Sequence, residues 1–209
     1  MLVTLVMILA QLLAPFSSAS SEVAGVAPGS GSRASAMLVL EPIAPEWCIA
    51  RAARVVGPDG KQSISLNKQN GVANLIASRE LVDQRVDSLA FAQSQGKLLK
   101  KEFAGYRELS FQPAAALGQD EAYVRDFTWK PGDGAQPVRQ LQGYFAQNGV
   151  AYVVTVTTAA ADFQASRRAN WSMLQSVSIG ARANSNGGEG EVVTGPLCPD
   201  PSSAPQTFA

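Results

Sequence analysis

Three apolar runs separated by two turn sequences dominate the part of the chain between residues 122 and 158. The runs are Ala122–Trp129, Val138–Ala146 and Val150–Thr158, and the last is rich in β-branched residues, which favour strands. Lys-Pro-Gly-Asp-Gly-Ala-Gln-Pro separates the first two runs and Gln-Asn-Gly separates the last two, both typical of hairpin loops. Strands joined by loops this short pair antiparallel. The sequence therefore predicts an antiparallel meander at the centre of the fold.

Further strand patterns precede this meander. Met37–Leu40 and Ile49–Val56 are short apolar runs, and Ser63–Leu66 alternates polar and apolar residues as a half-buried strand does. Asn70-Gly71 is a strong hairpin signal, after which Val72–Ala77 is expected to return as the next strand.

Two helical patterns complete the domain. The first begins at Asp87 or Ser88, carries an apolar stripe and ends at Gly105, and the second opens at Asp162. Lysines 97, 100 and 101 crowd the last turns of the first helix and are interpreted as a solvated face. Strands, helix, meander and helix indicate an α+β fold, a twisted antiparallel sheet with two main helices packed on it.

The composition changes at both ends of this domain, which is expected to span residues 37–180. Residues 1–20 are apolar for roughly fourteen residues, fewer than the roughly 20 that span a bilayer, and then turn small and polar as the end of a signal peptide does. The charged start of a signal peptide is missing, and the alternative is an apolar N-terminal extension or a misplaced start codon. Residues 21–36 read as a Gly/Ser-rich linker, and residues 181–209 as a disordered tail.

Charge and composition argue against several classes of function. The chain has 17 basic and 17 acidic residues, so it lacks the positive field that nucleic-acid binding needs. It has no histidine, which removes Ser-His and Cys-His nucleophile pairs and imidazole zinc sites. The clustered carboxylates, which are Asp120, Glu121, Asp126 and Asp133, are interpreted as solvated turn and strand residues. No enzymatic activity, metal or cofactor is expected.

The two cysteines, Cys48 and Cys198, are far apart in the sequence and match no metal-ligand spacing. In an oxidising compartment they could form a disulfide that ties the C-terminal tail to the start of the domain. Two unpaired thiols are the alternative.

A partner-binding surface is predicted on the meander. One aromatic row with an arginine shares a face of its strand, and a second row shares a face of the partner strand. If helices cover the other face, these residues form an open apolar surface suited to a hydrophobic peptide or helix. The alternative is that this face is the core. The predicted partner-binding residues are Tyr123, Arg125, Phe127, Trp129, Arg139, Leu141 and Phe145.

Several segments resemble the PsbP/DcrB-like superfamily over about residues 55–180. They are Pro58-Asp59-Gly60 with Ser63-Ile64, Ala73–Arg79, Glu102–Tyr106, Tyr123–Trp129 with Val138-Arg139-Gln140, and Tyr152–Phe163 with Trp171, Leu174 and Ser176. The turn after Pro58 lacks the tryptophan of the family pattern. The pattern is most similar to that of the Eag-type chaperones of type VI secretion.

The resemblance implies a PsbP-like α/β sandwich and a non-enzymatic role. Eag-type chaperones are cytoplasmic homodimers that shield transmembrane segments of toxin effectors. The expected function is therefore a cytoplasmic chaperone or adaptor, with a partner protein that has an apolar or transmembrane segment. Other members of the fold are exported, so the alternative is an exported envelope accessory protein or a lipoprotein-like protein, with residues 1–20 as the export signal.

Overall fold

The computed structural model describes residues 36–40, 47–49, 55–56, 62–68, 73–181, 192–193 and 198. The signal-like segment 1–20 and the linker up to residue 35 lie outside the described residues, as do the turns at Pro58-Asp59-Gly60 and Asn70-Gly71. Among the residues that are described, no helix is both long and apolar enough to cross a membrane.

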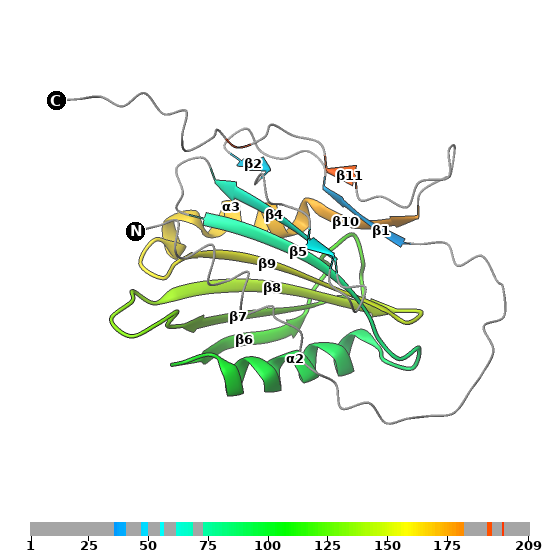
Figure 1. Ribbon diagram of the computed structural model, residues 1–209, viewed down its shortest axis with the longest axis horizontal. Helices are drawn as coiled ribbons and strands as arrows, with labels where there is room; N and C mark the ends of the chain where they lie inside the picture. The colour runs from blue at the N-terminus through cyan, green and yellow to red at the C-terminus, as the bar shows by residue number, and fades with distance from the viewer. Residues whose placement is uncertain are drawn as a thin grey trace.

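A large antiparallel sheet forms the centre of the domain (Figure 1). Its strands follow the order β2-β4-β5-β9-β8-β7-β6, and β3 pairs with β4 beside this path. The meander predicted from the sequence supplies β7, β8 and β9. The strands are β2 (Trp47–Ile49), β3 (Val55–Val56), β4 (Gln62–Lys68), β5 (Ala73–Leu81), β6 (Arg107–Pro113), β7 (Tyr123–Trp129), β8 (Val138–Gln147) and β9 (Val150–Ala159).

The turn between β8 and β9 has the geometry that its sequence predicts. Asn148 and Gly149 both have positive φ, 54° and 80°. Positive φ at both central residues defines the two-residue hairpin turn whose twist matches that of the strands, and Asn-Gly is its preferred sequence. This turn sets the register in which Gln147 pairs with Val150 and Tyr144 with Val153.

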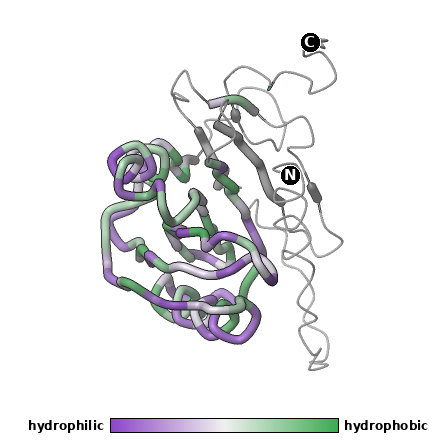
Figure 2. Tube along the Cα trace, turned by 90° about the vertical axis from the view of Figure 1, so that its left-hand side faces the viewer, coloured by the Kyte–Doolittle hydropathy of each residue, from purple (hydrophilic) through white to green (hydrophobic). Residues whose placement is uncertain are grey.

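Two helices cover the two faces of the sheet, as Figure 2 shows. Helix α2 (Ser88–Glu102) packs on β8 and β7, and helix α3 (Phe163–Gln175) packs on β9 and β8. The neighbours Tyr144 and Phe145 belong to different core clusters, the first with α2 residues and the second with α3 residues. Because side chains alternate along a strand, the helices lie on opposite faces.

Helix α2 begins where the sequence indicates. The side chain of Asp87 accepts a hydrogen bond from the backbone N–H of Ala90 at 2.7 Å, which satisfies one of the free donors of the first turn. At the other end, the backbone N–H of Phe103 donates to the carbonyl of Leu99, and Gly105 adopts φ 64°. A glycine at positive φ is a common helix terminator.

A small second sheet joins the two ends of the described chain. It has the order β10-β1-β11, with β1 (Ala36–Leu40) antiparallel to β10 (Val177–Ala181) and parallel to β11 (Val192–Val193). Strand β11 belongs to the segment expected to be a disordered tail. The described residues of that segment are therefore attached to the domain.

The predicted α+β fold class, an antiparallel sheet with two packed helices, is confirmed. Strands β6 and β10 were not predicted. Nearly all residues of β6 are exposed, so its sequence Arg-Glu-Leu-Ser-Phe-Gln-Pro lacks the strict alternation that identifies a half-buried strand.

Candidate functional site

The strand register separates the two rows of predicted binding residues. Phe127 of β7 pairs with Gln140 of β8, and Tyr123 pairs with Tyr144. The first row therefore shares a face with the even-numbered residues of β8; it consists of Tyr123, Arg125, Phe127 and Trp129. The second row, which consists of Arg139, Leu141 and Phe145, lies on the opposite face, so the expectation of one common surface is wrong. A shift of one residue in register moves a whole row to the other face, and the sequence does not fix that register.

Both rows are largely buried. Phe127 and Leu141 have no exposed surface, Trp129 and Arg125 are 3% exposed, and Phe145 is 5% exposed. Tyr123 and Arg139 are half-buried. The expected open surface does not exist at these residues, because helix α2 covers the first row and helix α3 covers the second. The alternative, that these residues are core, describes them correctly.

Beneath α2, a buried arginine is surrounded by aromatic rings. The guanidinium carbon of Arg125 lies 4.5 Å from the centre of the Phe111 ring and 5.5 Å from that of Tyr144. Its Nε lies 3.0 Å from Oε2 of Glu108, and the Tyr106 hydroxyl donates to the same oxygen at 3.1 Å. Ring faces and a carboxylate both stabilise a cation that burial removes from water.

Two tyrosines of this cluster are hydrogen-bond donors. Burial raises the pKa of Tyr106 to about 12, with the charge of Glu108 adding to the effect and that of Arg125 opposing it. Burial also raises the pKa of Tyr144, again against the effect of Arg125, and its hydroxyl donates to Oε1 of Gln142. Both phenols are therefore protonated at neutral pH and unsuited to act as bases.

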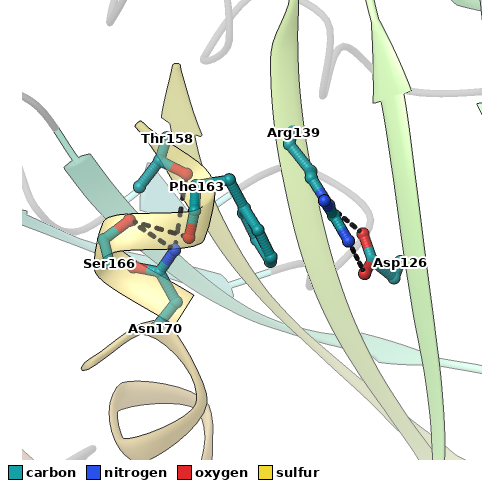
Figure 3. Close-up of polar contacts among 6 residues, drawn as sticks. All are labelled: Asp126, Arg139, Thr158, Phe163, Ser166 and Asn170. Carbon is teal, nitrogen blue, oxygen red and sulfur yellow. Dashed lines mark hydrogen bonds and ion pairs between the residues drawn. The ribbon is translucent and has the colours of Figure 1, made fainter. Parts of the chain in front are cut away.

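A second arginine lies between the sheet and the first turn of α3. Nε and Nη2 of Arg139 donate to the two carboxylate oxygens of Asp126 at 2.7 and 2.6 Å, and its guanidinium carbon is 3.8 Å from the centre of the Phe163 ring (Figure 3). Beside it, Nδ2 of Asn170 donates to the hydroxyls of Thr158 and Ser166. A bidentate pair of this kind is geometrically specific, and it joins β7, β8 and α3.

The sequence identified both arginines and named Asp126, but it did not indicate which residues surround each arginine. Glu108 and Phe111 lie on the unpredicted strand β6, and Phe163 is known as a partner of Arg139 only once α3 is placed over the sheet. A sequence signal for β6 did exist, since Tyr106-Arg107-Glu108 follows a helix-terminating glycine. The charged residues Arg107 and Glu108 interrupt the apolar pattern by which a strand is recognised.

The remaining candidate groups do not come together. Asp120 and Glu121 are exposed in the loop before β7, and Asp133 is exposed in the loop before β8. Asp126 forms an ion pair with Arg139. Within the described part of the chain, no three His, Cys, Asp or Glu residues are placed to hold a metal ion.

The two cysteines form a disulfide that links residues 150 positions apart. Cys48 is buried in β2, next to Trp47, which is 1% exposed and packs in the core on the α3 side of the sheet. The bond fastens Cys198, beyond β11, to an edge strand of the main sheet.

Several solved structures are similar to this chain at low identity. The PA94 protein of Pseudomonas aeruginosa, of unknown function, is 16% identical with a TM-score of 0.44, covering 62% of this chain and 78% of that chain. LpqN of Mycobacterium tuberculosis, described as involved in cell envelope biogenesis, is 16% identical with a TM-score of 0.42, covering 72% and 87%. Cyanobacterial PsbP (CyanoP) of Synechocystis is 11% identical with a TM-score of 0.43, covering 74% and 98%.

No curated protein matches the chain. At the level of families, the DcrB model matches residues 63–176. This range begins in β4 and ends just after α3, so it contains both arginine clusters and both helices. It covers more than half of the chain, and the protein therefore belongs to the DcrB family.

Proposed function

We propose that the protein is a non-enzymatic binding protein that works outside the cytoplasm, as an accessory protein of the cell envelope. The observation that carries this proposal is the disulfide between Cys48 and Cys198. Disulfides persist in oxidising compartments and are rare in the cytosol, where thiols are kept reduced. Residues 1–20, which resemble a signal peptide in part, supply a route of export.

The way in which the charged groups are engaged supports a non-enzymatic role. Arg125 is enclosed by Phe111, Tyr144 and Glu108, and Arg139 by Asp126 and Phe163. Catalytic acids and bases need a reactive protonation state and access to substrate. These arginines instead connect strands and helices, so their chemistry is structural.

Intact-mass analysis of the protein isolated from its native host tests the proposed location. Export through a cleaved signal predicts the loss of about twenty N-terminal residues. The disulfide predicts a mass 2 Da below that of the same chain after reduction, one hydrogen atom being lost from each thiol. A full-length chain with two free thiols would contradict the proposal.

The second candidate is a cytoplasmic chaperone or adaptor, acting as a homodimer, that shields an apolar or transmembrane segment of a secreted effector. The edge strand β6 favours it. Nearly all of its residues are exposed, and Leu109 is 40% exposed. Among the described strands, none pairs with its outer edge. An extended segment of a partner could add to such an edge through backbone hydrogen bonds.

Co-purification from the native host tests this candidate. A partner protein with an apolar segment is expected, and Leu109→Lys should release it because the charge opposes apolar contact at the edge. Leu81→Lys is the matched control, since Leu81 is 62% exposed at the end of β5. Recovery of no such partner, or equal loss with both variants, would count against the chaperone role.

A further inference from the structure

The outer face of α2 carries three lysines, and the one carboxylate of the helix, Glu102, is paired with Lys101. Lys97, Lys100 and Lys101 are exposed, and their spacing of three and four residues places them on one side of the helix. Gln93 and Ser94, which precede them on this side, are exposed and uncharged. The helix dipole accounts for a cation in the last turn only, whereas Lys97 lies further into the helix.

The fold adds a fourth lysine to this face. The backbone N–H of Lys130, at the end of β7, donates to the carbonyl of Ala104 at 2.8 Å. The stem of Lys130 lies beside Gly105, where an added Cβ would be 3.6 Å from Lys130 Cγ. Lys130 is exposed and therefore continues the positive surface beyond the end of the helix. These four lysines are the basic face of α2.

Two acidic residues near the basic face are paired with basic side chains. Glu102 lies 3.1 Å from the ammonium of Lys101, and Glu108 lies 3.0 Å from Arg125. The surface keeps an excess of positive charge although the formal net charge of the whole chain is zero. The sequence clusters three of these lysines, and the fold adds Lys130 to them.

We propose that the basic face of α2 docks the protein on the surface of an anionic lipid membrane. A protein partner would require a desolvated centre with aromatic or apolar anchors. The aromatic residues Phe91 and Phe103 instead pack toward the sheet, against Tyr144 and Trp129. Lipid phosphates need no such shape match, because long flexible lysines reach them from a convex surface. The inference goes beyond the proposed envelope role, to which no binding surface has been assigned.

Sedimentation of the full chain with lipid vesicles tests the inference. We expect binding to phosphatidylglycerol vesicles and much weaker binding to phosphatidylcholine vesicles, with the difference decreasing as salt is added. The variant K97Q/K101Q removes two charges and keeps the helix propensity, because Gln and Lys are similar helix formers. Each lysine near an anionic surface contributes about five-fold to partitioning, so the variant should bind about 25-fold more weakly.

The matched control is R167Q/R168Q. Arg167 and Arg168 are exposed on α3, on the other side of the sheet, and their replacement also removes two positive charges. This variant should bind the anionic vesicles as the unmodified protein does. Equal losses in the two variants would show that net charge alone matters and would overturn the inference.

Two further outcomes would also overturn it. One is the absence of binding to anionic vesicles. The other is equal binding to both lipids by the unmodified protein and by K97Q/K101Q. That result would assign the attachment to the apolar N-terminal segment. The mass analysis measures the disulfide and the N-terminal cleavage directly. Failure of the vesicle experiment would therefore not contradict the proposed location outside the cytoplasm.

Discussion

The guanidinium of Arg125 lies directly against Gly96 in the middle of α2. A Cβ added at Gly96 would be 2.5 Å from Arg125 Cζ, a distance that real Cβ contacts do not reach. Arg125 is 3% exposed and held by Glu108, Phe111 and Tyr144, so it has little room to move. Glycine lowers helix stability, and its presence here is explained by the close approach of the arginine.

Gly96→Ala should therefore lower the free energy of unfolding. In an open helix this change stabilises by about 1 kcal/mol, but overpacking a filled interface costs about 1–3 kcal/mol. Denaturant unfolding measures the difference. In an Arg125→Met background the flexible methionine can move aside, so that Gly96→Ala should leave the free energy of unfolding unchanged or raise it. Gly132, with no atom within 4 Å of an added Cβ, is the control position at which Ala should not destabilise. Stabilisation by Gly96→Ala alone would contradict the contact.

Phe127→Asp and Leu141→Asp should each unfold the domain. Both side chains have no exposed surface, and they lie on opposite faces of the sheet, under different helices. A buried unpaired charge costs several kcal/mol, comparable to the stability of a whole domain. Circular dichroism and thermal melting measure the loss. Leu109→Asp, at a residue that is 40% exposed, should remain folded. A Phe127→Asp protein that stays folded but does not bind its partner would show that Phe127 lies on an open binding surface after all.

The elements of the fold could largely be predicted from the sequence because local signals determine them. The Asn148-Gly149 turn has the positive φ values that its residues prefer, and Asp87 caps α2. Strand β6 was missed because an exposed edge strand needs no apolar alternation. Its residues Glu108 and Phe111 became recognisable only as neighbours of Arg125.

The candidate site could not be predicted in the same way because it depends on register and on long-range packing. Whether Phe127 faces the same side as Gln140 or Leu141 depends on a shift of one residue. Likewise, Cys48 and Cys198 offer no local signal for pairing, since 150 residues separate them. Only the three-dimensional arrangement distinguishes the disulfide from two thiols.

Removal of the disulfide should lower the stability of the domain. Closing a loop of this length restricts the unfolded chain, and the loss of a native disulfide typically costs about 2–5 kcal/mol. Cys198→Ser should lower the melting temperature by as much as a reductant lowers that of the unmodified protein. The variant itself should not respond to reductant. A melting temperature that is identical with and without the bond would show that the C-terminal link does not stabilise the fold.

Alkaline pH should destabilise the domain, because its buried tyrosines keep their protons in the folded state to higher pH than in the unfolded state. Burial raises the pKa of Tyr106 from its usual value of 10.0 to about 12, and burial also raises the pKa of Tyr144 and of Tyr152. The unfolded chain loses these protons near pH 10, whereas the folded chain keeps them, so the unfolded state is favoured as pH rises from about 10 to about 12.

The stability that these groups contribute is therefore complete below about pH 10 and lost as pH passes through the folded-state pKa values. Melting temperature and tyrosinate absorbance, followed together, should show ionisation that coincides with unfolding. Tyr106→Phe provides the control, because it removes the most exposed member of the set and should make the alkaline loss of stability shallower. Ionisation of all four tyrosines near pH 10 in a domain that stays folded would show that the buried phenols are open to water, and would contradict the packing of α2 over Tyr144.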